Sequence, residues 1–313
     1  MKTKISCCIL FLSVILFFNN KLIAQDNIDS TSVYHNTFYI IETYNGGQFI
    51  GEILRQDEKE ILINTKDRGQ IAIPKYEVKE IRELKGGELN TKGDYMPEEV
   101  FSTRYFITTN GLPIKKGENY VLWNLYGPEI HFGVGKNIGV GLMTSWFGMP
   151  IIGSAKYSIH VSEKINIGFG TLLGTGSWAV PDFALALPYG VLTYGDRRNN
   201  INFSGGYGIV AYDGIAEGKA LMSVAAMKKV GKKVSIVFDS FIVPQVRFTN
   251  STYDPNTDIE LTTNKYSVLA ILIPGIRIQE EPNKAFQFGF AGIYGNGEFV
   301  PIPIPFLQWY RKF

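Results

Sequence analysis

From residue 101 to the C-terminus, large apolar residues alternate with small or polar ones. The run 165–174 places Ile165, Ile167 and Phe169 on one face and an asparagine and glycines on the other. Successive side chains of a β-strand point to opposite faces, so a period of two predicts strands with one large apolar face. The same alternation recurs over residues 138–146, 151–161 and 284–290.

The second face of these runs distinguishes a soluble sheet from a membrane barrel. A soluble sandwich buries its large apolar face and exposes a charged one. Here the second face is small, polar and rich in glycine, with few charges. An apolar outside and a polar inside are typical of outer-membrane barrels. We therefore expect an all-β fold, with an antiparallel transmembrane β-barrel over residues 101–313.

Polar turns divide this region into strands, and outer-membrane barrels have short periplasmic turns and longer outer loops. The longest connection is the polar stretch from Arg247 to Asn264, which we expect to be an outer loop. Counting from Asn119 gives eleven strands. An antiparallel barrel with both ends on one side needs an even number, so residues 102–109 are assigned as the first of twelve. The short, periplasmic set of turns is predicted at residues 136–137, 162–164, 196–199, 231–232 and 280–283.

The N-terminus has the features of a secretory signal peptide. Two lysines precede an apolar run from Ile5 to Phe18, and Ala24 offers a small residue for cleavage. The run is shorter than the about 18 apolar residues that suggest a membrane-spanning helix, and no later segment reaches that length. We expect residues 1–24 to be removed, leaving an extension over residues 25–37; the alternative is an uncleaved anchor.

Charge divides the remaining chain into two parts. Without the three lysines of the leader, 28 basic residues face 29 acidic ones, which gives no support for binding nucleic acid. Residues 25–100 hold 15 acids and 9 bases, whereas residues 101–313 hold 14 acids and 19 bases. A polar linker with glycines and a proline, residues 86–100, joins the two parts. Both cysteines lie in the leader, so disulfides and cysteine metal sites are not expected.

Residues 38–85 are predicted to form a small soluble β-domain. A β-branched and aromatic run over residues 38–43 ends near Asn45-Gly46, a strong hairpin signal because that turn needs positive φ. Five short strands in such a length resemble an Sm-like or SH3-like small barrel, and such folds host many unrelated functions. We expect this domain in the periplasm, where it contacts a partner or the cell wall. The four further strands are predicted at residues 49–54, 60–64, 70–73 and 77–84.

The chain ends in aromatic residues, and Trp309 and Phe313 resemble the C-terminal signal that barrel-insertion machinery recognises. Residues 102–106 and 112–120 are similar to the barrel entry of uncharacterised outer-membrane proteins common in Bacteroidota. That resemblance extends over nearly the whole mature chain. It implies an outer-membrane location, with outer-membrane lipid and the insertion machinery as partners. No activity is established for that family, so the resemblance transfers no catalytic residue and no cofactor.

Several polar and charged residues fall on the inward face of the predicted strands and are expected to line the lumen. Outer-membrane phospholipases place a His and a Ser two residues apart on a strand. Here the order is reversed and the pair faces the lumen, so catalysis is not expected. A metal site at Glu129, His131 and His160 would need three inward ligands at one depth, and polar packing explains them more simply. The lumen candidates are Glu129, His131, Lys156, Ser158, His160 and Asp239, with Lys265 and Arg277 as further possibilities.

Two functions without catalysis remain open. The inward charges could line a narrow path for small solutes, since rings of charge set selectivity in channels. They could instead pair across the lumen and plug it, which would make the barrel a structural or anchoring protein. Twelve strands lie between small barrels filled by side chains and wide porins, so strand number does not decide. The alternatives are an enzyme acting on lipid through Ser158 and His160, or a secreted soluble β-protein.

Overall fold

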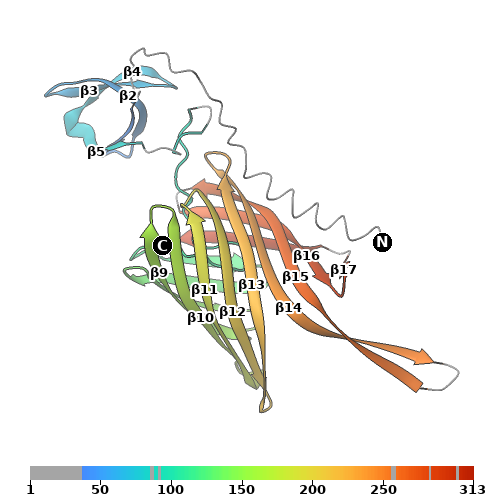
Figure 1. Ribbon diagram of the computed structural model, residues 1–313. Helices are drawn as coiled ribbons and strands as arrows, with labels where there is room; N and C mark the ends of the chain where they lie inside the picture. Colours follow the sequence, from blue (N-terminus) through green and yellow to red (C-terminus); the bar gives the residue numbers. More distant parts are fainter. Residues whose placement is uncertain (1–36, 85–87, 91–92, 255–258, 282, 301–302) are drawn as a thin grey trace, which may run out of the picture. The chain divides into compact units, whose positions relative to one another are not determined.

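The computed structural model describes residues 37–313, apart from positions 85–87, 91–92, 255–258, 282 and 301–302 (Figure 1). The predicted leader, the extension before residue 37 and parts of the predicted linker lie outside the described residues. The chain divides into two compact units at residues 84 and 85, and each is described by itself. Among the described residues, no helix has the length and apolarity needed to span a membrane.

The first unit is a five-stranded antiparallel sheet in the order β4-β3-β2-β1-β5. All five predicted strands are confirmed, and a single 3-10 turn, Lys75–Glu77, separates the last two. The strands are β1 (Phe38–Thr43), β2 (Gln48–Gln56), β3 (Glu60–Thr65), β4 (Gly69–Pro74) and β5 (Val78–Glu83).

Isoleucines from three strands form the core of this unit. Ile41, Ile61 and Ile63 have no exposed surface, and Ile73 is 2% exposed. The predicted turn after β1 is stabilised locally, because Gly46 has a positive φ of 84° and the Asn45 side chain accepts a hydrogen bond from the Gly47 amide at 3.0 Å. A small unit with one isoleucine cluster depends strongly on each member of that cluster.

The second unit is a closed antiparallel barrel of twelve strands, each paired with its sequence neighbours. Pairing of the first strand with the last closes the ring, as in the register Gln308↔Asn124. A two-residue strand, β17 (Glu298–Phe299), adds to the end of β16. The twelve strands are β6 (Tyr120–Asn124), β7 (Gly127–Gly135), β8 (Ile138–Thr144), β9 (Ile151–Ser162), β10 (Ile165–Gly176), β11 (Val180–Gly195), β12 (Asn199–Tyr212), β13 (Ile215–Lys229), β14 (Val234–Asp254), β15 (Ile259–Glu281), β16 (Lys284–Gly295) and β18 (Ile304–Lys312).

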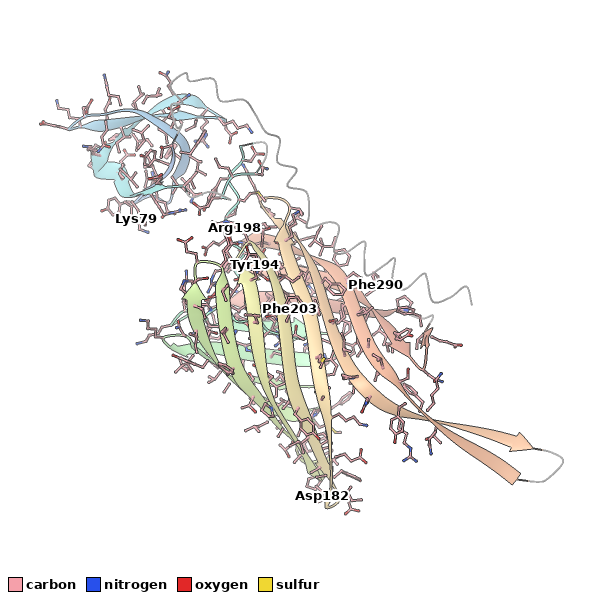
Figure 2. All side chains as sticks on the ribbon, viewed as in Figure 1. Lys79, Asp182, Tyr194, Arg198, Phe203 and Phe290 are labelled. Carbon is pink, nitrogen blue, oxygen red and sulfur yellow. The ribbon has the colours of Figure 1, made fainter. Side chains whose placement is uncertain are left out.

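The two faces of the barrel wall differ as the alternation predicts. Large apolar side chains cover the outside, among them Tyr194, Phe203 and Phe290, each at least half exposed (Figure 2). Polar side chains such as Asn202 and Gln287 point inward and have no exposed surface. A soluble protein reverses this distribution, because it buries its large apolar residues away from water.

The predicted count of twelve strands is confirmed, but the identity of the first strand was wrong. Residues 102–109 form no barrel strand. The stretch from Asn119 to the turn at residues 136–137, counted as a single strand in the sequence analysis, forms two strands, β6 and β7. The Asn124 side chain closes the extra turn by accepting hydrogen bonds from the amides of Tyr126 and Gly127 at 2.8 and 2.9 Å. Gly127 is required there, because a Cβ atom would lie 1.9 Å from the Thr144 carbonyl oxygen.

The long outer loop predicted from Arg247 to Asn264 was also wrong. β14 and β15 continue through most of this stretch as a paired hairpin that projects beyond the other strands (Figure 1). Polar residues such as Thr249 and Asn264 are compatible with strand pairing when both faces of the ladder meet water, and these two side chains bond to each other at 3.0 Å. The short turns after β7, β9, β11 and β13 lie where they were predicted.

We predict that the first unit unfolds independently of the barrel. Ile63→Ala should destabilise this unit by about 2–5 kcal/mol, because it removes a fully buried side chain from a small core. Limited proteolysis of the full chain in detergent should then remove the unit faster. The heat-induced shift of the barrel on a gel should stay unchanged. Exposed Leu54→Ala is the control, and a loss of the barrel shift in Ile63→Ala would contradict two independent units.

Candidate functional site

A segment without regular secondary structure fills part of the barrel lumen. We call residues 99–114 the plug. Phe101, Ser102, Tyr105, Phe106 and Asn110 in this segment are 1% exposed or less. Contacts from the plug reach all twelve strands of the barrel, through hydrogen bonds, an ion pair, ring contacts or close backbone approach.

Asp239 on β14 holds the middle of the plug. Its carboxylate accepts hydrogen bonds from the backbone amides of Ile107 and Thr108, at 2.6 and 2.9 Å, and from the Thr108 hydroxyl at 2.6 Å. The side chain has no exposed surface. Hydrogen bonds to a buried charge are stronger than those between neutral groups, so this contact fixes the position of two consecutive plug residues.

Arg277 on β15 holds the start of the plug from the adjacent strand. Its guanidinium donates to the carbonyl oxygens of Phe101 at 2.6 Å and Arg104 at 2.7 Å, and to Gln287 on β16 at 2.6 Å. Tyr310 on β18 lies under the same guanidinium, 4.9 Å from the ring centroid. The planar fork of arginine allows one side chain to bind several carbonyl groups at once.

Side chains on the opposite wall bind the end of the plug. Lys156 on β9 donates to the carbonyl oxygens of Asn110 and Leu112, at 2.7 and 3.2 Å, and to the Thr109 hydroxyl at 3.1 Å. Thr193 on β11 accepts a hydrogen bond from the Gly111 amide at 2.8 Å. Main-chain groups of the plug thus bond to side chains of the wall rather than to a strand ladder.

Glycines in the wall make room for the plug. A Cβ atom at Gly275 or Gly289 would lie 2.5 or 2.7 Å from the ring of Phe106. Gly111 in the plug is equally constrained, since a Cβ atom there would lie 2.7 Å from the Asn166 carbonyl oxygen of β10. Part of the small inward face recognised in the sequence is therefore the contact surface of the plug.

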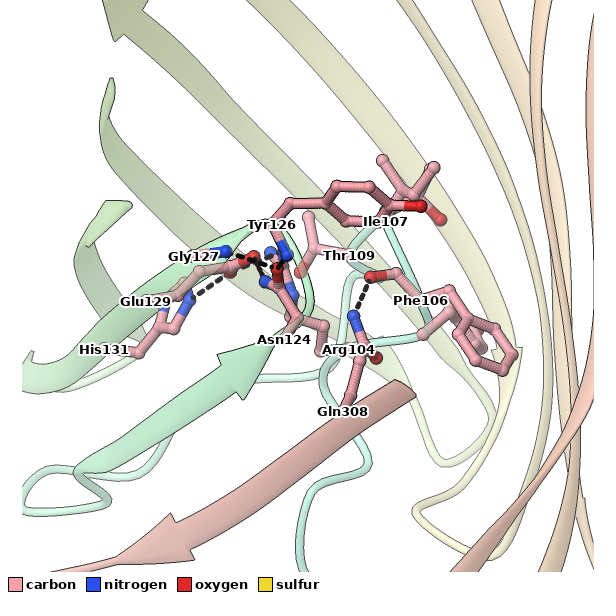
Figure 3. A network of polar contacts seen from close by, with 12 residues as sticks. Arg104, Phe106, Ile107, Thr109, Asn124, Tyr126, Gly127, Glu129, His131 and Gln308 are labelled. Atoms are coloured by element: carbon pink, nitrogen blue, oxygen red, sulfur yellow. Dashed lines mark hydrogen bonds and ion pairs between the residues drawn. The ribbon is translucent and has the colours of Figure 1, made fainter. Parts of the chain in front are cut away.

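A buried ionic network joins the plug to β7 (Figure 3). Arg104 pairs with Glu129 at 2.6 Å, and both side chains are at most 9% exposed. The same carboxylate lies 3.3 Å from a ring nitrogen of His131 and accepts a hydrogen bond from Asn124 at 3.2 Å. The His131 ring stacks on Tyr120 of β6 at a centroid distance of 4.8 Å.

A second ionic cluster fixes the chain where it leaves the plug and enters β6. Glu118 forms a two-bond pair with Arg197 at 3.0 Å for each bond, and it also pairs with Lys312 of β18 at 3.1 Å. Burial raises the pKa of Glu118, but the hydrogen bonds and charge of Arg197, with the Lys115 amide and Lys312, together lower it to about 2. This carboxyl is ionised at neutral pH and ties together three segments of the barrel.

The structure brings together only some of the predicted lumen residues. Glu129 and His131 contact each other, and Lys156, Ser158 and Asp239 are buried against the plug. His160 is exposed and bonds to Asn166 at 3.0 Å. Lys265 is exposed on the β14–β15 hairpin, so it lines no lumen.

The Ser158 and His160 pair does not form a nucleophilic site in this structure. The Ser158 hydroxyl has no exposed surface and lies 3.3 Å from the Leu112 carbonyl oxygen of the plug, while His160 bonds elsewhere. Nucleophilic catalysis needs the base within hydrogen-bond reach of the hydroxyl. Within the described part of the chain, no group of three or more His, Cys, Asp or Glu residues is placed to hold a metal ion.

Other wall residues that bind the plug were not predicted. Gln287, Gln308 and Tyr310 bond to plug carbonyl groups, and Asn200 binds the Tyr105 hydroxyl at 2.6 Å. The alternation places these residues on the inward face, so that signal was available. Their role was missed because residues 102–109 were assigned to the barrel wall. That assignment left no segment in the lumen to which these side chains could bond.

Comparisons with known proteins show no family. No protein-family model and no curated protein matches the chain. A solved structure described as the NanC porin in a rhombohedral crystal form is similar, with 10% sequence identity and a TM-score of 0.41. The match covers 62% of this chain and 98% of that one. A likeness this distant carries no argument about function.

We predict that Glu118 makes barrel stability depend on pH. Its folded pKa of about 2 lies below its ordinary value of 4.5, so its contribution is present above pH 4.5 and is lost as pH falls toward 2. Glu118→Gln should cost about 1–3 kcal/mol at pH 7, because it removes hydrogen bonds to a charged partner. Thermal unfolding of the barrel between pH 7 and 2.5 measures this.

The wild-type midpoint should fall toward that of Glu118→Gln as the pH decreases. Exposed Glu217→Gln, on the far end of β13, is the control and should keep the wild-type profile. A constant difference between wild type and Glu118→Gln across the pH range would show that the carboxyl charge is not the cause.

Proposed function

We propose that this protein is an outer-membrane barrel closed by its own plug, and that it serves as a structural anchor for the small domain. The observation that carries the proposal is the plug itself, residues 99–114, whose contacts reach every strand of the barrel. Passive diffusion of solutes, the other function open from the sequence, needs a continuous aqueous path past this segment.

The outer face of the barrel supports a membrane location. Phe169 and Leu173 on β10, Tyr207 on β12 and Met222 on β13 are each more than half exposed. Monomeric soluble proteins rarely expose contiguous apolar patches larger than a few hundred Å². Lipid is the environment in which a barrel with this exterior and a polar interior is stable, because closure satisfies every ladder hydrogen bond.

The ionic anchors favour a lumen that stays closed. Moving the plug out would leave the buried carboxylate of Asp239 and the guanidinium of Arg277 without their main partners. Each unsatisfied buried group costs about 1–3 kcal/mol, and charged groups cost more. A conducting state would therefore need an input of free energy that passive diffusion does not supply.

The small domain is the remaining working part in this proposal. Its five-stranded order, with a 3-10 turn before the last strand, is compatible with the Sm-like or SH3-like resemblance. We propose that it lies in the periplasm and contacts the cell wall or a protein partner. The membership in the Bacteroidota-type family, the insertion signal at Trp309 and Phe313, and the absence of enzymatic activity stay predictions.

Planar-bilayer conductance of the refolded mature protein tests the closed lumen. The wild-type protein should insert without discrete steps of conductance. Asp239→Ala should produce them, because it removes the acceptor of three hydrogen bonds from the plug. Exposed Asp182→Ala, on β11 outside the plug contacts, is the matched control and should remain silent.

Steady conductance of the wild-type protein would overturn the proposal in favour of a channel. If Asp239→Ala still shows the heat-induced gel shift of a folded barrel but stays silent, Asp239 does not hold the plug, and the closure would rest on other contacts. Lys156→Met is the second variant, because it releases the opposite end of the plug. It tests whether contacts other than those of Asp239 keep the lumen closed.

A further inference from the structure

A cavity of about 300 Å³ lies inside the barrel against the plug. Plug residues 104, 106–109 and 114 form one boundary, and residues of the strands and of the β6–β7 turn form the rest. Its size is at the lower end of the range for pockets that hold small organic molecules, about 300–1,000 Å³. The proposed structural role uses the plug and the outer face and leaves this space without a function.

The two sides of the cavity differ in polarity. Polar and charged groups come from β6, β7 and β9 and from the plug, among them Asn124, Glu129 and Lys156. The other side is mainly apolar and comes from strands β10 to β14. It presents Leu172, Leu187, Val191, Leu221 and Phe241. A ligand that fits both sides has a polar head and an apolar body.

Two polar atoms at the cavity have no hydrogen-bond partner in the described structure. They are the Nε of Arg104, whose residue is 8% exposed, and the hydroxyl of Ser223, whose residue is 4% exposed. Buried polar groups are nearly always paired, so these two atoms mark a cavity wall whose hydrogen bonding is incomplete, although both are themselves covered by neighbouring atoms. The Arg104 Nε–H can only donate.

With Lys156 protonated, the formal charges of the residues that line the cavity sum to one positive charge. Arg104 is compensated by Glu129 at 2.6 Å. Lys156 donates to two carbonyl oxygens and one hydroxyl, and no carboxylate lies in ion-pair contact with it among the described residues. A ligand with one negative charge would balance this excess, whereas a cationic ligand would increase it.

We propose that this cavity binds a single amphipathic monoanion, an aliphatic carboxylate, with its head beside Arg104 and its apolar body against the β10–β14 wall. The carboxylate accepts from Arg104 and lies near the charge of Lys156. The body covers Leu172, Leu187 and Leu221, whose burial against an aliphatic chain is favourable because it removes apolar surface from water. This site goes beyond the anchoring role and does not depend on whether the barrel conducts.

Native mass spectrometry of the full-length mature protein in a non-ionic detergent measures the binding. Three probes of equal chain length are compared: decanoate, decan-1-ol and decylammonium. Decanoate should form a saturable one-to-one complex. Decan-1-ol should bind about tenfold to a hundredfold more weakly, since it lacks the charged acceptor for the guanidinium. Decylammonium should bind least.

Two variants locate the site. Ser204→Phe places a large ring at the cavity wall from β12 and should abolish binding of decanoate and decan-1-ol. Its matched control is Ser162→Phe at an exposed turn, which should bind as wild type does. The double change Arg104→Gln and Glu129→Gln removes both charges of the pair and should weaken the binding of decanoate, while the charge of Lys156 keeps decanoate ahead of decan-1-ol.

Several results would overturn the proposal. They are the absence of saturable binding by all three probes, undiminished binding in a folded Ser204→Phe, or equal binding of decanoate and decylammonium. The gel shift on heating shows whether each variant is folded. Where Ser204→Phe does not fold, the milder Ser204→Leu replaces it, with a partial loss of binding as the expected result. Conductance of the wild-type barrel would refute the closed lumen, but it would not decide whether the cavity binds decanoate.

Discussion

Backbone amides and carbonyls that leave water must find hydrogen-bond partners, and the plug meets this requirement without a ladder. Asp239 binds two consecutive amides, Arg277 binds two carbonyl oxygens, and Lys156 binds two more near the end of the segment. Three charged side chains, each on a different strand, thus supply partners that a neighbouring strand would otherwise provide. Main-chain bonds within the plug supply others, such as the bond from the Tyr105 amide to the Thr108 carbonyl oxygen at 3.0 Å. The conformation of the plug and the choice of inward polar residues follow from this exchange, and the closed lumen that we propose depends on it.

The wall of the barrel is adapted to the same requirement. A side chain with a Cβ atom at Gly275 or Gly289 would collide with Phe106, so these positions hold glycine where the plug approaches most closely. Where the plug does not fill the lumen, a cavity with a polar and an apolar side remains next to Arg104. The proposed closure and the proposed ligand site therefore both depend on the plug. Closure depends on the part of the lumen that the plug fills, and the ligand site is the part that it leaves empty.

The alternation of residues along the chain was sufficient to predict most strands of the barrel, since period two is a local property of each segment, but it did not separate β6 from β7. It could not separate residues 102–109 from a wall strand, because a run such as Thr103 to Ile107 has the β-branched and aromatic character of a strand. Its partners lie more than a hundred residues away, at Asp239 and Arg277.

Local signals were present at Asn124 and Gly127, which mark the turn between β6 and β7. The predicted inward residues Lys156 and Asp239 lie at the plug, whereas His160 lies at the exposed end of its strand. Periodicity predicts which face of the sheet a residue is on, but not how deep in the lumen it lies.

Amide hydrogen exchange of the protein inserted in lipid bilayers tests the plug most directly. If residues 99–114 are held by the wall, the amides of Ile107, Thr108 and Gly111 should exchange as slowly as those of the β10–β11 ladder. Exchange within seconds, at the rate of the exposed turn at Asp213 and Gly214, would show that the segment is not fixed in the lumen. That result would contradict the lumen closed by the plug, on which the proposed function depends.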